Sequence, residues 1–331
     1  MAELNHRPAD ADGSADTHTW VPGADDALYA EILAEADAFV AGFAPPMRAL
    51  LAASLEPMRA RAFVRLAALL PAALADLAPV APETARRLGL ANLYAAWYYH
   101  AQDDLLDGQA AASDWLVGHL VFGQAIETYR GLGLVGAPVW AEFGRLGHRS
   151  ADAYALELQQ RFSAVGALGP DQLAAFSLEF LLDRVGPLFF SPLAQLHLAG
   201  IPAHAERAKD LIEALRCWAA ARQIGDDARD WLDDLKAGQL NYVAARLIER
   251  WIPDGGERTL ERLATFHLTA DECWAEIERT AGSLTHSALD LLAPYGPSRL
   301  RGLVDRQLAE QAELWAALRA KRAEFRAMFG L

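Results

Sequence analysis

The chain has 331 residues, of which 53% are hydrophobic and 22% charged, so it can bury a full core and is neither a low-complexity nor a disordered polypeptide. Its 30 basic and 44 acidic residues give a formal net charge of −14, and an acidic surface repels phosphate backbones, which excludes nucleic-acid binding. The two cysteines, Cys217 and Cys273, are too few for a disulfide framework, so we expect a cytoplasmic protein that buries both.

Residues 1–24 are predicted to form a disordered tail, because they are polar and acidic and lack the apolar run of a secretion signal. Helical periodicity begins near Asp25 and continues to the C-terminus, in a composition rich in Ala and Leu. Clusters of proline and glycine, with Pro71 among them, divide this region into about ten helices. Because no spacer separates them, we predict a single all-α domain over residues 25–331.

Three long helices are the clearest of these elements. They are predicted at residues 82–107, at 205–236 with Gly238 as the stop, and at 298–329. Between the first two, the uncharged run 185–205 has the length of a membrane span but contains three prolines. We therefore expect a broken, buried helix there and no span across a membrane.

The first long helix ends in a cluster of aspartates. Asp103 and Asp107 are four residues apart, and Asp104 and Asp107 are three apart, so these carboxylates share one face of the helix. Like charges at this spacing cost about 0.2 to 0.5 kcal/mol per pair and, at a helix C-terminus, they also oppose the helix dipole. Such an arrangement needs a compensating positive charge.

The second long helix repeats the arrangement with Asp226, Asp227 and Asp230, and Gln223 lies one turn before them. Either cluster alone is typical of a solvated acidic helix end. The pair of clusters, each in an apolar helix, instead indicates a bound cation. Carboxylates select hard divalent ions, and Mg²⁺ is expected because it takes few carboxylates, several waters and substrate phosphate oxygens.

Two Asp-Asp-x-x-Asp motifs on helices, 123 residues apart, resemble the class I isoprenoid synthase superfamily, that is, the trans-prenyl diphosphate synthases and the class I terpene synthases. The resemblance covers residues 88–248. It implies a bundle of helices around a central cavity, in which the six aspartates are catalytic and hold about three Mg²⁺ ions over an allylic isoprenyl diphosphate. It also implies a homodimer.

The resemblance further implies diphosphate-binding residues. Arg184 stands where prenyl synthases have a lysine, in a stretch similar to their Lys-Thr-x-x-Leu-Phe, and arginine suits phosphate. Gln223 opens a match to Gln-Ile-x-Asp-Asp-x-x-Asp, with Arg222 in place of the family's aromatic residue. Lys236 is a candidate for the charge that is lost where Gln239 replaces a family lysine.

Two basic elements of the prenyl synthases are missing. Residues 108–113 carry no base where the family has an Arg-Arg pair, and the Gly-Gly-Lys-x-x-Arg element near the N-terminus is absent. The nearest basic stretch, 58–65, is expected to decorate a helix face. Since two diphosphates need cationic partners, we place first a Mg²⁺-dependent terpene synthase, a diphosphate lyase that ionises an allylic diphosphate and then cyclises or eliminates. The alternative is a trans-prenyltransferase, a polyprenyl diphosphate synthase that adds isopentenyl diphosphate, and the second motif is of that type.

An allylic cation must be kept from water in an apolar cavity and is stabilised by aromatic faces. Aromatic residues cluster in the sequence around the motifs, and each one alone is equally explained by core packing. The candidates for cavity lining are Trp97, Tyr98, Tyr99, Phe189, Phe190 and Trp218. His100, one turn before the first motif, is either a structural histidine or a functional one that bonds a carboxylate or acts as a base.

Two other classes of function fit the sequence less well. A carboxylate-bridged di-metal oxidoreductase needs Glu-x-x-His pairs on two core helices, and the only such spacing is from Glu3 to His6 in the tail. A non-catalytic partner subunit of a prenyl synthase would lose one or both aspartate motifs, and this chain keeps both.

Overall fold

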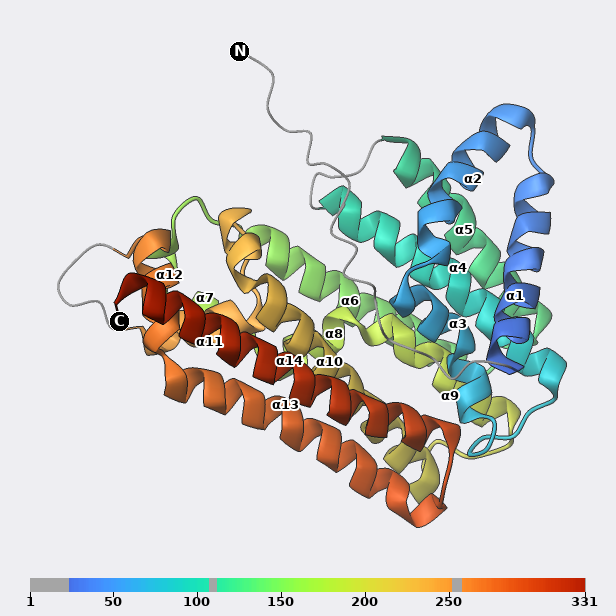
Figure 1. Ribbon diagram of the computed structural model, residues 1–331. Helices are drawn as coiled ribbons and strands as arrows, with labels where there is room; N and C mark the ends of the chain where they lie inside the picture. The colour runs from blue at the N-terminus through green and yellow to red at the C-terminus, as the bar shows by residue number, and fades with distance from the viewer. Residues whose placement is uncertain (1–23, 107–111, 252–257, 331) are drawn as a thin grey trace. The chain divides into compact units, whose positions relative to one another are not determined.

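The computed structural model describes residues 24–106, 112–251 and 258–330, and within these ranges the chain forms fourteen α-helices and no strand (Figure 1). The predicted all-α class is confirmed. Apart from Ala24, the predicted tail lies outside the described residues, and so does Asp107. The chain divides into two compact units, and the expectation of a single domain stays a prediction.

Unit 1 comprises residues 1–72 and 81–135. Within it α4 packs along α5 and against α1. Gly89 permits a close approach of α4 to α3, because a Cβ atom at this position would lie 2.3 Å from the carbonyl oxygen of Ala68. The helices are α1 (Ala24–Ala41), α2 (Pro45–Arg59), α3 (Ala62–Leu74, whose last two residues belong to unit 2), α4 (Pro82–Leu106) and α5 (Ala112–Gly131).

Pro71 does not break a helix, contrary to the prediction, but lies inside α3. Proline has no N–H, so it leaves the carbonyl of Ala67, four residues earlier, without its helical donor. The buried Asn92 of α4 replaces this donor: its Nδ2 donates to the Ala67 oxygen at 2.8 Å, and its Oδ1 accepts from the Tyr129 hydroxyl of α5 at 3.3 Å. A polar contact between helices therefore permits the proline.

We predict that N92L destabilises the protein, because it removes the donor to the Ala67 carbonyl and the acceptor of the Tyr129 hydroxyl. Each lost partner costs about 1 to 3 kcal/mol. Adding P71A to N92L restores a backbone N–H for Ala67 and should recover part of the loss. Denaturant unfolding of wild type and variants measures these free energies. An unchanged free energy of unfolding in N92L would contradict the interpretation.

Unit 2 comprises residues 73–80 and 136–331. Its long helix α10 packs most extensively against α13, and α14 runs beside α13 (Figure 1). The helices are α6 (Trp140–Gln159), α7 (Pro170–Ala175), α8 (Leu178–Arg184), α9 (Phe190–Leu198), α10 (Glu206–Lys236), α11 (Tyr242–Arg250), α12 (Leu260–Thr269), α13 (Asp271–Leu292) and α14 (Arg299–Phe329).

The ends of the long helices agree with the sequence analysis. Helix α10 stops at Gly238, which has a φ of +75° and whose missing Cβ would lie 2.5 Å from the Phe162 carbonyl oxygen. Only glycine meets both conditions without strain. Helix α14 begins after Ser298, whose side chain accepts a hydrogen bond from the Arg301 amide. The run 185–205 is a broken helix, as predicted, with a 3₁₀ turn before α9.

The described residues contain more helices than the roughly ten that were predicted. The additional boundaries lie at Ala60, at Phe176 and at Ala270, none of which is a proline or glycine. At Ala270 the chain passes from α12 to α13 within one residue. The boundary at Phe176 is followed by a capping residue, Ser177, whose side chain accepts a hydrogen bond from the Phe180 amide.

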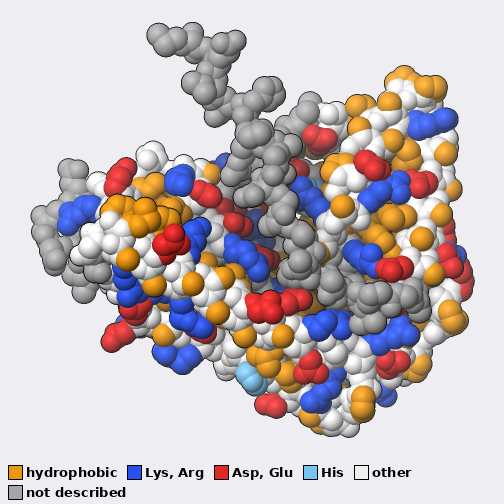
Figure 2. Space-filling model, in the orientation of Figure 1, with side chains coloured by type: hydrophobic (Ala, Val, Ile, Leu, Met, Phe, Trp, Pro, Cys, Tyr) orange, Lys and Arg blue, Asp and Glu red, His pale blue; other side chains and the backbone are white. Residues whose placement is uncertain are grey.

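Charged side chains of both signs are mixed on the face of the molecule that Figure 2 shows. Between α13 and α14, for example, Asp271 pairs with Arg322 and Arg326, and Arg319 pairs with Glu278. None of the described helices combines the length and the apolar composition that a bilayer crossing requires.

His267 of α12 packs between two tryptophans of unit 2. Its ring centroid lies 4.8 Å from that of Trp231 and 6.5 Å from that of Trp274, and its Nδ1 lies 2.5 Å from the carbonyl oxygen of Ala264. Burial is the main reason that the pKa of His267 falls to about 4. The folded protein therefore holds this imidazole neutral at pH 6, where the unfolded chain begins to protonate it.

Because the pKa of His267 is lower in the folded than in the unfolded state, its contribution to stability is complete above pH 6.5 and declines as the pH falls towards 4. We expect wild type to lose about 1 to 3 kcal/mol more over this range than H267Q, which does not titrate. Urea unfolding at pH 7 and pH 4.5 measures the difference. Equal losses in the two proteins would show that this histidine does not titrate as inferred.

Candidate functional site

Two aspartates of the first cluster, Asp103 and Asp104, lie in the last turn of α4, as predicted, and Asp107 lies outside the described residues. Asp103 and Asp104 are partly exposed. His100 Nε2 lies 3.2 Å from Asp104 Oδ2, one helical turn away. Of the two roles left open for His100, the structure therefore contains the contact with a carboxylate.

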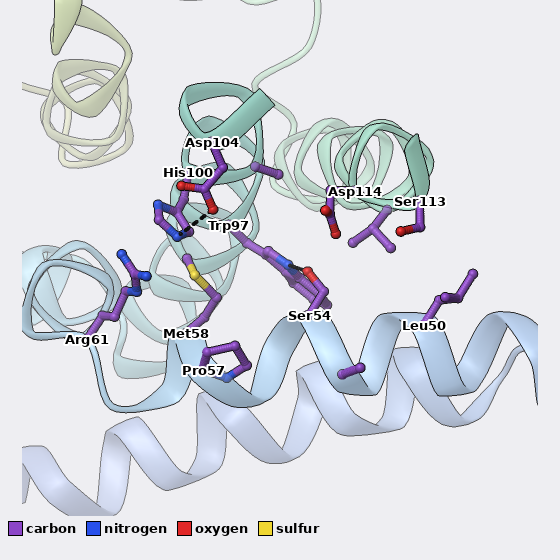
Figure 3. Close-up of a pocket in the computed structure, with 13 residues that line it drawn as sticks. Leu50, Ser54, Pro57, Met58, Arg61, Trp97, His100, Asp104, Ser113 and Asp114 are labelled. Carbon is purple, nitrogen blue, oxygen red and sulfur yellow. Dashed lines mark hydrogen bonds and ion pairs between the residues drawn. The ribbon is translucent and has the colours of Figure 1, made fainter. Parts of the chain in front are cut away.

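A pocket of about 270 Å³ adjoins Asp104 in unit 1 (Figure 3). On one wall the Trp97 indole donates from Nε1 to Ser54 Oγ at 2.8 Å. Charged and polar groups come from α4, from the start of α5 and from the segment before α3. The lining residues are Leu50, Ala53, Ser54, Pro57, Met58, Arg61, Trp97, His100, Ala101, Asp104, Ser113, Asp114 and Val117.

Arg61 is the basic residue of this pocket, and Figure 3 shows its side chain pointing toward His100. The expectation that the stretch 58–65 decorates a helix face holds for Arg59 and Arg65, which pair with Asp37 and Asp26 of α1. Arg61 is exposed, but it lies between α2 and α3 and lines the pocket. No carboxylate among the described residues forms an ion pair with its guanidinium.

The pKa of His100 is lowered from its usual value. Burial is the largest cause, the positive charge of Arg61 acts in the same direction, and Asp104 and Asp103 oppose the shift. At pH 7 the imidazole is therefore largely neutral. An anion bound beside Arg61 would oppose part of this shift and favour the protonated imidazole.

The second cluster lies on α10, and its three aspartates differ in exposure. Asp226 is half exposed and pairs with Arg229 at 2.7 Å, and Asp230 is exposed. Asp227 is only 4% exposed. Its Oδ1 accepts from Gln223 Nε2 at 2.8 Å and its Oδ2 accepts from the Tyr242 amide at 2.9 Å. Asp226 and Asp230 are thus accessible to a metal, whereas Asp227 is enclosed by protein.

Burial raises the pKa of Asp227 to about 7. The hydrogen bond from Gln223, the charge of Arg184 and the bond from the Tyr242 amide act in the opposite direction, and Asp234 adds to the increase. Two hydrogen bonds and the charge of Arg184 therefore stabilise the Asp227 carboxylate where solvent hardly reaches it.

Arg184, the predicted diphosphate ligand, ends α8. Its Nε lies 3.4 Å from Glu157 Oε2 of α6, and its guanidinium lies 5.6 Å from the ring centroid of Tyr154. Glu157 is buried. The sequence analysis did not find Glu157, because a single glutamate on an amphipathic helix gives no signal of its own.

The other predicted diphosphate-binding residues also contact protein groups. The Arg222 guanidinium lies 5.9 Å from the Trp218 ring centroid, and Lys236 Nζ lies 2.7 Å from Asp233 Oδ1. The side-chain amide of Gln223 donates a hydrogen bond to Asp227. Their roles towards a diphosphate stay predictions.

The six aromatic residues predicted to line a cavity lie in both units. Trp97 lines the pocket beside Asp104. Tyr98 and Tyr99 pack together with ring centroids 5.0 Å apart. The other three are buried in unit 2: Phe189, Phe190 and Trp218. For these five, a role in lining a substrate cavity stays a prediction.

Within the described ranges, no three His, Cys, Asp or Glu side chains are grouped closely enough to hold a metal ion. The donors themselves fit the expected ion, because Asp103, Asp104, Asp226 and Asp230 offer accessible carboxylate oxygens of the kind that Mg²⁺ prefers. Asp227 does not fit as well, since both of its oxygens already accept hydrogen bonds from protein donors.

No family model and no curated protein sequence matches the chain, but solved structures do. The decaprenyl diphosphate synthase from Rhodobacter capsulatus superposes with a TM-score of 0.67 at 17% identity, over 87% of this chain and 98% of its own. The chain has the prenyl diphosphate synthase fold.

Two further structures of this fold agree. The polyprenyl synthase from Roseobacter denitrificans superposes with a TM-score of 0.64 at 17% identity, over 88% of this chain and 98% of its own. The polyprenyl synthase from Caulobacter crescentus, complexed with calcium and isoprenyl diphosphate, has a TM-score of 0.63 at 18% identity, over 88% of this chain and 94% of its own. The fold that the resemblance implied is confirmed.

Proposed function

We propose that the protein is a trans-prenyltransferase that condenses an allylic diphosphate with isopentenyl diphosphate. The observation that carries the proposal is the prenyl diphosphate synthase fold over almost nine-tenths of the chain, with Asp103 and Asp104 of the first motif on α4 and the second motif on α10. The structural neighbours are prenyl diphosphate synthases, which favours this alternative over the terpene synthase that the sequence analysis places first.

The metal ligands in this proposal are Asp103, Asp104 and Asp107 of the first motif and Asp226 and Asp230 of the second. Bound Mg²⁺ supplies the positive charge that stabilises the departing diphosphate when the allylic carbon–oxygen bond breaks. The calcium in the Caulobacter crescentus complex supports a divalent ion. Asp226 must first exchange its contact with Arg229 for the metal.

Arg184 binds the allylic diphosphate in this proposal. Its guanidinium is held by Glu157 and by the face of Tyr154, so it is already oriented before substrate arrives. A diphosphate offers a denser negative charge than a single carboxylate and favours a bidentate contact. Arg222, Gln223 and Lys236 are secondary candidates, and a homodimer stays a prediction from the resemblance.

The second diphosphate is bound by Arg61 and His100. Chain elongation needs such a site, and residues 108–113 carry none of the usual bases. In the pocket beside Asp104, Arg61 forms no ion pair with a described carboxylate, and the pKa of His100 is lowered by burial and by the charge of Arg61. A diphosphate bound by Arg61 would raise the pKa of His100, so that the imidazolium adds a second charged donor.

We expect R61Q to raise the KM for isopentenyl diphosphate by at least about tenfold and to leave the KM for the allylic substrate unchanged, because one charge-assisted contact is lost. R65Q is the matched control, since Arg65 pairs with Asp26 instead of lining the pocket. Steady-state kinetics with each substrate varied in turn measures both constants. An equal effect of R61Q on the two substrates would contradict a separate second site.

The terpene synthase remains the second candidate, on the observation that residues 108–113 lack the bases that hold a second diphosphate in the prenyl synthases. It differs from the first candidate in its products. A terpene synthase releases a hydrocarbon or alcohol from one allylic substrate, whereas a prenyltransferase forms a longer diphosphate only when isopentenyl diphosphate is present.

The deciding experiment incubates the protein and Mg²⁺ with geranyl, farnesyl or geranylgeranyl diphosphate, with and without isopentenyl diphosphate, and analyses the products by mass spectrometry. We expect a longer diphosphate that depends on isopentenyl diphosphate and on the metal. D103A and D226A should reduce turnover by about a thousandfold or more without unfolding the protein. Full activity after chelation, or in both variants, would overturn the metal assignment.

A further inference from the structure

The buried carboxylate of Asp227 lies at the N-terminus of α11. The first amide of that helix, Tyr242 N–H, donates to Asp227 Oδ2 at 2.9 Å, and the third, Ala244 N–H, donates to Asn241 Oδ1 at 2.8 Å. Helix N-termini leave their first amides without intrahelical acceptors and carry partial positive charge. A carboxylate there satisfies a donor and is stabilised by the helix dipole.

Asn241, the residue before α11, forms a second connection between α10 and α11. Its Nδ2 donates to the Asp227 carbonyl oxygen at 3.3 Å and to Asp234 Oδ2 at 2.7 Å. Asp227 and Asp234 are seven residues apart, so they lie on one face of α10, the face that contacts α11. Asp226 and Asp230, four residues apart, lie on the accessible side.

We propose that Asp227 is a positioning residue that fixes the start of α11 and the amide of Gln223 against α10, and that it is not a metal ligand. The second half of this proposal rests on the proposed function, which supplies the metal. Asp227 is only 4% exposed, so to reach a cation in solvent its carboxylate would have to turn away from the donors that enclose it. One of them, the backbone amide of Tyr242, would remain buried without an acceptor.

The arrangement divides the second motif into two tasks. Asp226 and Asp230 are able to move towards a cation, because Asp230 is exposed and Asp226, which is half exposed, contacts the exposed Arg229. Asp227 keeps the helix that carries them attached to α11 and holds Gln223 one turn earlier on the same helix. Asp227 therefore acts through the position of its neighbours.

The substitution D227N separates the two roles. The amide that it introduces keeps one oxygen, which still accepts from the Tyr242 amide. Its NH₂ group faces Gln223, whose side-chain amide turns over and accepts with Oε1. A positioning role thus survives D227N and is lost in D227A, whereas the role of a metal ligand is weakened by D227N as much as by D226N.

The test compares wild type, D227N, D227A and D226N with two measurements. Hydrogen exchange of the Tyr242 amide, followed by NMR in the metal-free protein, should be at least about tenfold faster in D227A and unchanged in D227N. Mn²⁺ titration followed by electron paramagnetic resonance should give wild-type affinity in D227N and at least about tenfold weaker binding in D226N. If D227A fails to fold, D227N alone still tests the proposal, because its Tyr242 exchange rate and its Mn²⁺ affinity are both expected to equal those of wild type.

A loss of Mn²⁺ affinity in D227N equal to that in D226N would overturn the proposal. Unchanged Tyr242 exchange in D227A, or fast exchange in D227N, would overturn it as well. If wild type binds no Mn²⁺, the metal in the proposed function is wrong, and the exchange measurement still determines whether Asp227 holds α11.

Discussion

The repulsion between neighbouring carboxylates is the constraint on which this structure depends. Aspartates three and four residues apart on one helix destabilise it unless something compensates their charge. The protein compensates them one by one: a histidine contacts Asp104, an arginine one turn later pairs with Asp226, and backbone and amide donors enclose Asp227. The compensation of the accessible aspartates is weak, because exposed pairs contribute little. The accessible aspartates are therefore the ones that can exchange their present contacts for a bound cation.

The helix boundaries that follow from local chemistry were predictable from the sequence. Pro82 and Gly238 determine where α4 begins and α10 stops, and Ser298 caps α14, because each effect is contained within one turn of the chain. Pro71 shows the opposite case. Its cost inside α3 is offset by a side chain twenty-one residues later in the sequence, and no local pattern shows this.

The candidate site was predictable in its residue types and less so in its geometry. Spacing placed the aspartates of each motif within one turn of a helix, but it did not show that Asp227 faces α11, since that depends on where a neighbouring helix begins. Arg61 and Glu157 were missed for a related reason. Arg61 belongs to a basic stretch and Glu157 to an amphipathic helix, and each becomes significant only through the residue that the fold brings to it, His100 or Arg184.

The hydrogen-bond chain from Tyr129 through Asn92 to Ala67 also has an evolutionary consequence. Proline at position 71 is tolerated only while another group donates a hydrogen bond to the Ala67 carbonyl. Asn92 is favoured at its own position only while that carbonyl lacks its helical donor. The two positions are therefore expected to change together among related chains. Where a relative has an ordinary residue at position 71, the position of Asn92 becomes free to accept an apolar side chain, and α3 and α4 can then pack without any polar contact between them.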